Sequence, residues 1–148
     1  YVNACRFGIV MYGFYAPEDY NLQSTFSLRS EVVQINTLQP GESLGYGGAF
    51  VAEEETEIAV VPIGYADGII RKNKGRAVYI NNQAYEIVGN ICMDMSMLDV
   101  TGLDVKVGDT VTIFGEDPTI TELATVLGTI PYEILTSVPR RIERIIVK

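Results

Sequence analysis

The sequence predicts a mainly β domain, barrel-like in architecture, with one or two short helices. Short apolar runs recur at spacings of roughly ten to fifteen residues, which is typical of a β-barrel or sandwich rather than of alternating β/α units. Turns rich in glycine and asparagine separate these runs, and only the region after residue 118 carries clear helix signals. Together these observations favour short strands that close around one core.

The strands are expected at residues 28–35, 57–63, 77–80, 85–88, 97–100 and 110–114. Asn81 and Asn82 predict a tight hairpin, because asparagine tolerates the positive φ angles that such turns require. Residues 5–13 predict a further strand that ends in a turn. The polar stretch 16–23, which contains Pro17, predicts a linker after it.

The first helix is expected to begin near Thr119 or Thr121, with Glu122 supporting its first turn. Gly128 would end this helix, and Leu123, Val126 and Leu127 are predicted to form its apolar face. Residues 131–135 predict another helical turn that starts at a proline.

Composition excludes several classes of function. The chain of 148 residues has a net charge of −8, which argues against binding to nucleic-acid phosphates. It contains no histidine, so Ser-His-Asp machinery and the commonest transition-metal ligand are both missing. Cys5 and Cys92 form no CxxC motif, and we expect no metal site. No apolar run approaches a membrane span, and we expect a cytoplasmic protein without membrane contact from this segment. The basic clusters 71–76 and 139–144 are expected to be solvated.

Two tyrosines stand in glycine-rich turns. Tyr46 lies in Gly-Tyr-Gly-Gly, and Tyr65 lies in Gly-Tyr-Ala-Asp-Gly at the end of a predicted strand. Glycine lets backbone approach a small ligand closely, and a phenol can do acid–base work when its surroundings lower its pKa from about 10. Taken alone, either tyrosine could equally be a structural turn residue.

Two further segments could present backbone N–H groups to an anion. One is the turn at Met93, whose side chain could equally fill the core. The other places Arg6 just before the amides of Gly8 and Ile9, an arrangement that can hold a phosphate.

The order and spacing of these segments resemble the C-terminal part of alanine racemase, a pyridoxal-phosphate enzyme of fold type III. The matching segments cover nearly the whole chain: RFGIVMYG (6–13), GESLGYGG (41–48), IGYADG (63–68), IVGNICMD (87–94) and TIPYE (129–133). The chain departs from the family pattern at two positions. Asn90 stands where many relatives carry a basic residue, and Pro131 stands where asparagine is usual.

The resemblance implies a role for each candidate residue. Tyr46 matches the second catalytic base, Met93 supplies an amide to the substrate carboxylate, and Tyr65 matches a residue of the substrate corridor. On the cofactor side, Arg6 matches the arginine at the pyridine nitrogen. The amides of Gly8 and Ile9, with Tyr132, match the phosphate-binding groups.

The resemblance also implies the organisation of the complete enzyme. Residues 1–21 match the last strand of an N-terminal (β/α)₈ barrel and a linker, and residues 22–148 match the C-terminal β domain. The β domain of one subunit closes the site on the partner subunit's barrel in a homodimer. The cofactor lysine lies near the first strand of that barrel, and no lysine of this chain matches it.

The expected function is therefore interconversion of L- and D-alanine for cell-wall peptidoglycan, with the 148-residue chain inactive by itself. A serine racemase of the same family and a non-catalytic β-barrel module for binding or dimerisation remain open. The racemase hypothesis requires the loops of Tyr46, Tyr65 and Met93 to converge on one face. It also leads us to expect residues 1–15 to pack away from the β core.

Overall fold

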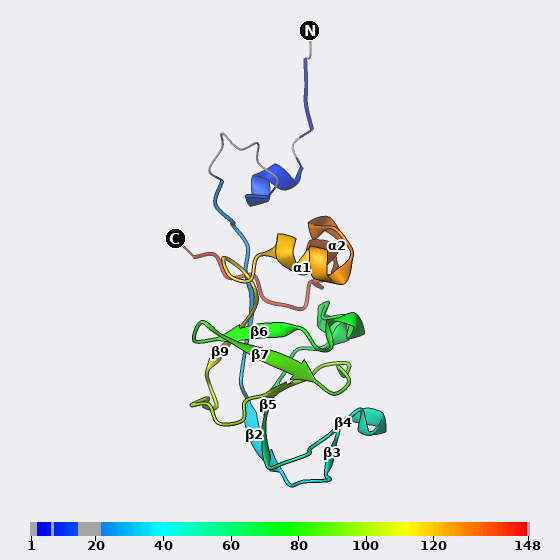
Figure 1. Ribbon diagram of the computed structural model, residues 1–148. Helices are drawn as coiled ribbons and strands as arrows, with labels where there is room; N and C mark the ends of the chain where they lie inside the picture. The colour runs from blue at the N-terminus through cyan, green and yellow to red at the C-terminus, as the bar shows by residue number, and fades with distance from the viewer. Residues whose placement is uncertain (1–2, 7, 15–21, 148) are drawn as a thin grey trace.

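The computed structural model describes residues 3–6, 8–14 and 22–147. The elements of the main sheet are β1 (Leu28–Glu31), β2 (Gln34–Leu38), β5 (Thr56–Val61), β6 (Ala77–Ile80), β7 (Gln83–Val88), β8 (Ser96–Asp99) and β9 (Thr110–Phe114). They form one antiparallel sheet in the order β1-β9-β6-β7-β8-β5-β2, which curls around the core (Figure 1). A small hairpin of β3 (Ser43–Leu44) and β4 (Phe50–Val51) stands apart from it. The mainly β prediction is confirmed.

The sequence predicted one strand over 28–35, but the structure has two that lie at opposite edges of the sheet. β1 pairs with β9, whereas β2 pairs with β5. The switch occurs between adjacent residues, because the Val32 N–H donates to the carbonyl of Asp109 and the Val33 N–H donates to that of Val60. An apolar pattern of period two cannot report this change of partner, so the break is invisible in the sequence.

The predicted hairpin is confirmed. Asn81 and Asn82 have φ angles of 51° and 63°, and they join β6 to β7 with Ile80 paired to Gln83. β7 then also pairs with β8 through Ile87 and Leu98. The core between the strands is made mainly of buried aliphatic side chains, including Ile80, Ile87 and Leu98.

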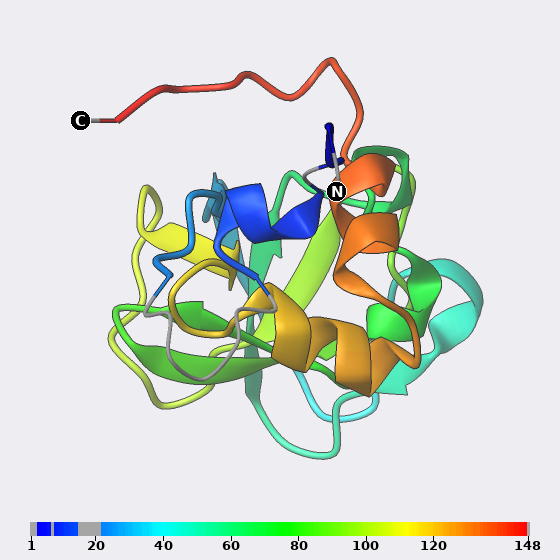
Figure 2. The same ribbon diagram turned by 90° about the horizontal axis from the view of Figure 1, so that it is seen from above.

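Two helices cover one end of the sheet: α1 (Ile120–Leu127) and α2 (Pro131–Ser137) (Figure 2). Thr119 caps α1, because its side chain accepts from the Glu122 N–H while the Glu122 carboxylate accepts from the Thr119 N–H. Gly128 ends the helix with a φ of 68°. One part of the prediction is wrong: Val126 is 66% exposed. The buried face is formed by residues 120, 123, 124 and 127, and steps of 100° place Val126 outside it.

The strand predicted over residues 5–13 is absent from the described part of that segment. Ile9–Tyr12 form a 3₁₀ helix, η1. Two hydrogen bonds close it: the Met11 N–H donates to the carbonyl of Gly8, and the Gly13 N–H donates to the carbonyl of Val10. The linker prediction and the domain boundary at residue 21 lie mostly outside the described residues. Residues 3–6 and 8–12 lie above the sheet (Figure 1), but Phe14 is only 6% exposed and belongs to the main core. The expectation that residues 1–15 pack away from the core is therefore wrong at Phe14.

No helix within the described ranges is long and apolar enough to span a membrane.

Candidate active site

Tyr46 lies on a short 3₁₀ turn, η2 (Tyr46–Gly48), between strands β3 and β4. Its neighbours Gly45 and Gly47 have φ angles of 69° and 72°, which side chains rarely adopt, so glycine is what allows the turn. Tyr46 is 77% exposed. Its backbone carbonyl accepts a hydrogen bond of 2.9 Å from the Asn90 side chain, which ties η2 to the loop that leads to Met93.

Tyr65 begins a second 3₁₀ turn, η3 (Tyr65–Asp67), which follows β5 after three connecting residues. This turn is hydrogen-bonded to the loop that carries Met93. The Tyr65 N–H donates to the carbonyl of Cys92 at 3.1 Å, and the Ala66 N–H donates to the carbonyl of Met93 at 2.8 Å. A side chain at Gly64 would place Cβ within 2.4–2.6 Å of Cys92 and Met93 backbone atoms. The two loops therefore form one closely packed unit.

The three loops meet at one cleft of about 580 Å³. Tyr46, Tyr65 and Met93 all line it, together with Leu44, Gly45, Val60, Cys92, Asp94, Met95 and Met97. The expected convergence of these three residues is confirmed. The Met93 N–H, unlike that of Cys92, donates to no acceptor among the described residues, so it remains available to a ligand.

The remaining candidates lie elsewhere. Gly8 lies against the side chain of Tyr132 near the start of α2, and a Cβ added at Gly8 would come within 2.5 Å of the Tyr132 hydroxyl oxygen. Arg6 is exposed, and Ile9 begins η1. None of these residues lines the Tyr46 cleft. The β3-β4 hairpin with η2 and helix α2 lie at opposite ends of the domain (Figure 1).

Comparisons with known proteins identify the family of this chain. The family model described as "Alanine racemase, C-terminal domain" matches residues 25–146. The chain belongs to the alanine racemase family. It is 38% identical to the alanine racemase of Helicobacter pylori over 99% of the chain and 42% of that relative. The alanine racemase of Deinococcus radiodurans is 44% identical over 97% of the chain and 42% of its own length.

A solved structure extends the agreement to the fold. The alanine racemase of Bartonella henselae, with covalently bound pyridoxal phosphate, superposes with a TM-score of 0.86 at 34% identity, covering 93% of this chain and 40% of that one. The family's C-terminal β domain is thus the fold of this chain. The chain spans about two fifths of the length of the curated relatives it matches.

Sequence reasoning missed the groups that hold these loops in place. Asp67 is buried, accepts from the Gly64 N–H and pairs with Arg141, although residues 139–144 were expected to be solvated. The spacing of Gly64 and Asp67 is that of a helix cap and could have indicated the first contact. No pattern in the sequence could have indicated Arg141, because it lies far along the chain.

Proposed function

We propose that this chain is the C-terminal β domain of an enzyme that interconverts L- and D-alanine with pyridoxal phosphate. The observation that carries the proposal is one cleft that is lined by Tyr46, Tyr65 and Met93. The N–H of Met93 donates to no acceptor among the described residues and can bind a ligand. Family membership supplies the reaction, and the cleft offers groups of the kind that this reaction needs.

Racemisation requires one group that removes the α-proton and another that returns a proton from the opposite side. Tyr46 is the group of this chain that can do one of these steps. Its hydroxyl is on an exposed side chain at the cleft, and its backbone is fixed by glycine turns and by Asn90. In this proposal the second base is a lysine of the N-terminal barrel, which this chain does not contain.

The substrate carboxylate would accept a hydrogen bond from the Met93 N–H. Tyr65 would line the corridor beside it, since its turn is bonded to the Met93 loop. A backbone donor on a loop held by several hydrogen bonds orients a carboxylate without losing side-chain entropy. The rest of the lining is mainly apolar, with Leu44, Val60 and two further methionines, and Asp94 is its one acidic residue.

A second region, formed by Gly8, Ile9 and Tyr132 outside the Tyr46 cleft, fits a phosphate group. Gly8 has no side chain where it approaches the Tyr132 hydroxyl, so backbone amides and a phenol can face the same anion. Gly8, Ile9 and Tyr132 would hold the phosphate of the cofactor, and Arg6 would donate to its pyridine nitrogen. When bound, pyridoxal phosphate stabilises negative charge at the α-carbon of the amino acid.

The two regions support a homodimer. The cleft and the phosphate-binding region lie on different parts of the same domain, so one chain is suited to contribute to two active centres. The Tyr46 cleft would close the site on the partner subunit's barrel, while Gly8 and Tyr132 would serve the site of their own subunit. We place this enzyme in the cytoplasm, where it would supply D-alanine for peptidoglycan.

The experiment joins the chain in frame to the N-terminal barrel of the Helicobacter pylori relative and measures D-alanine formation from L-alanine with added pyridoxal phosphate. We expect turnover by the joined protein and none by the 148-residue chain alone. The barrel alone serves as the second control. A folded, dimeric joined protein that binds the cofactor but converts neither alanine nor serine would contradict the proposal, and preference for serine would favour the serine racemase.

A further inference from the structure

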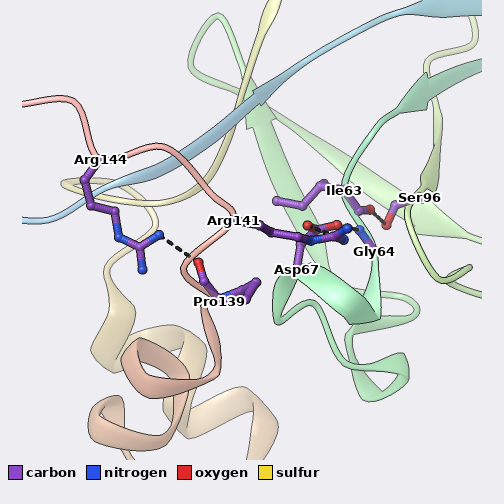
Figure 3. Close-up of polar contacts among 7 residues, drawn as sticks. All are labelled: Ile63, Gly64, Asp67, Ser96, Pro139, Arg141 and Arg144. Carbon is purple, nitrogen blue, oxygen red and sulfur yellow. Dashed lines mark hydrogen bonds and ion pairs between the residues drawn. The ribbon is translucent and has the colours of Figure 1, made fainter.

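Asp67 is a buried carboxylate whose two oxygens have different partners (Figure 3). One oxygen, Oδ2, accepts the Gly64 N–H at 3.0 Å. The other, Oδ1, lies 2.7 Å from Nη2 of Arg141. The Asp67 side chain is 6% exposed and that of Arg141 is 54% exposed, so the guanidinium covers the carboxylate from the solvent side.

The contacts of Gly64 lead from this carboxylate to the cleft. Gly64 packs directly on the Cys92 and Met93 backbone, as the 2.4 Å approach of its would-be Cβ to the Cys92 carbonyl oxygen shows. The residue before Gly64 is also held in place, because the Ser96 hydroxyl donates to the carbonyl of Ile63 at 2.7 Å. The position of the Met93 N–H therefore depends on Gly64, and the position of Gly64 depends on Asp67.

Arg141 reaches Asp67 from the segment after α2, some seventy residues along the chain. That segment is turned back on itself by Arg144, whose guanidinium donates to the carbonyl of Pro139 at 2.8 Å (Figure 3). The Ile142 N–H donates to the same carbonyl at 3.2 Å. Arg141 is thus presented by an ordered turn rather than by a free tail.

We propose that Asp67 and Arg141 are a positioning pair that holds the Met93 amide and Tyr65 in the geometry of the substrate cleft. The proposal rests on the proposed function for the identity of the substrate, but the pair itself can be tested without activity. Neither residue touches the cleft, since both are absent from its lining. They act through Gly64 and the loop that it contacts.

The burial of Asp67 distinguishes this pair from an ordinary surface ion pair. Exposed pairs contribute little to stability, because water screens both charges. Removing one partner of a buried charge is different, because it leaves the other charge uncompensated. Loss of Arg141 should therefore draw the Asp67 carboxylate toward water and release the Gly64 N–H, which opens the loop unit locally.

The first experiment measures amide hydrogen exchange in the 148-residue chain by NMR. We expect Arg141→Met to speed exchange at Tyr65 and Ala66 by at least about tenfold, which corresponds to about 1.4 kcal/mol in the opening equilibrium. Amides of β5 should stay within about twofold of wild type. Arg140→Met is the matched control, because Arg140 is exposed and forms no ion pair or hydrogen bond with the residues that the structure describes.

A double-mutant cycle separates the effect of the Asp67–Arg141 ion pair from that of the hydrogen bond between Asp67 and the Gly64 N–H. Asp67→Asn retains an oxygen that can accept from the Gly64 N–H but loses the charge, so Arg141→Met should add less than about a twofold change in that background. Should Arg141→Met unfold the chain, Arg141→Lys tests the same amides with a smaller expected effect. Equal acceleration at the loop amides and at β5, or no acceleration at either, overturns the proposal.

The second experiment uses the joined protein. Arg141→Met should raise KM for alanine by about tenfold with kcat within about twofold, since the Met93 amide would bind the carboxylate in ground and transition states alike. Arg140→Met should change neither. An unchanged KM in an active Arg141→Met enzyme overturns the positioning role. A wild-type joined protein without activity contradicts the proposed function instead, and the exchange data then still decide whether the pair holds the loops.

Discussion

Gly64→Ala should be among the most damaging single-methyl additions to this domain. The backbone at Gly64 is extended, with φ −145° and ψ −159°, so alanine adopts it without conformational strain. The cost is steric, because the new Cβ would lie 2.4 Å from the carbonyl oxygen of Cys92 and 2.6 Å from Met93 backbone atoms. These atoms belong to a loop held by hydrogen bonds on both sides and cannot move independently.

Inserting a methyl group into a well-packed interior costs about 1–3 kcal/mol. Since only backbone is available to give way, we expect the upper end of that range, about 3 kcal/mol. With a urea m-value of about 2 kcal/mol/M, the unfolding midpoint should fall by about 1.5 M. Urea titration followed by circular dichroism measures this shift directly.

Gly8→Ala is the matched control. Its Cβ would approach the Tyr132 hydroxyl oxygen to 2.5 Å, nearly the same distance, but this atom is the end of a side chain rather than part of the backbone, so a small side-chain adjustment relieves the contact. We expect a change within about 0.5 kcal/mol. A Gly64→Ala variant as stable as Gly8→Ala would refute the reasoning that the Gly64 and Met93 loops form one rigid unit.

Three further predictions concern catalysis, helix capping and the core. In the joined protein, Tyr46→Phe should lower kcat by about 10²–10⁴-fold, and proton exchange with solvent deuterium should be affected more for one alanine enantiomer. Because Tyr46 is 77% exposed, circular dichroism should be unchanged; near-normal rates for both enantiomers would remove this phenol from the mechanism. Hydrogen bonds from Thr119 hold the pKa of Glu122 below its ordinary value of 4.5. A lowered pKa in the folded state means that the ionised group stabilises the fold above pH 4.5 and that this contribution is lost as the pH falls through the folded pKa. Denaturation of Glu122→Gln and wild type should therefore show a stability gap at neutral pH that narrows in acid, and a constant gap would contradict the capping argument. Leu98→Ala should cost about 2–5 kcal/mol in urea denaturation because the side chain is fully buried, whereas Val126→Ala on the exposed side of α1 should cost less than about 0.5 kcal/mol.

The features that the sequence determined by itself are those with local causes. The turn at Asn81 and Asn82, the cap of Thr119 on Glu122 and the ending of α1 at Gly128 each depend on residues a few positions apart. The glycines around Tyr46 likewise specify their own turn through positive φ angles. Such features need no partner from elsewhere in the chain, so residue type and spacing were sufficient to predict them.

The tertiary structure decided every feature that depends on a distant partner. A strand needs a neighbour for its hydrogen bonds, so the sequence could not separate β1 from β2 at Val32 and Val33. For the same reason Ile9–Tyr12 form a 3₁₀ turn with local bonds where a strand was predicted. The convergence of the Tyr46, Tyr65 and Met93 loops was expected only through a family resemblance.

Arg141 shows the limit most clearly. Its sequence neighbours suggest a solvated basic segment, yet it covers a buried carboxylate that supports the cleft. Whether a charged residue is solvated or paired depends on which surface the fold brings opposite it, and that surface comes from residues some seventy positions away. Residue type determined the chemistry available to this domain, while the path of the chain determined which groups act together.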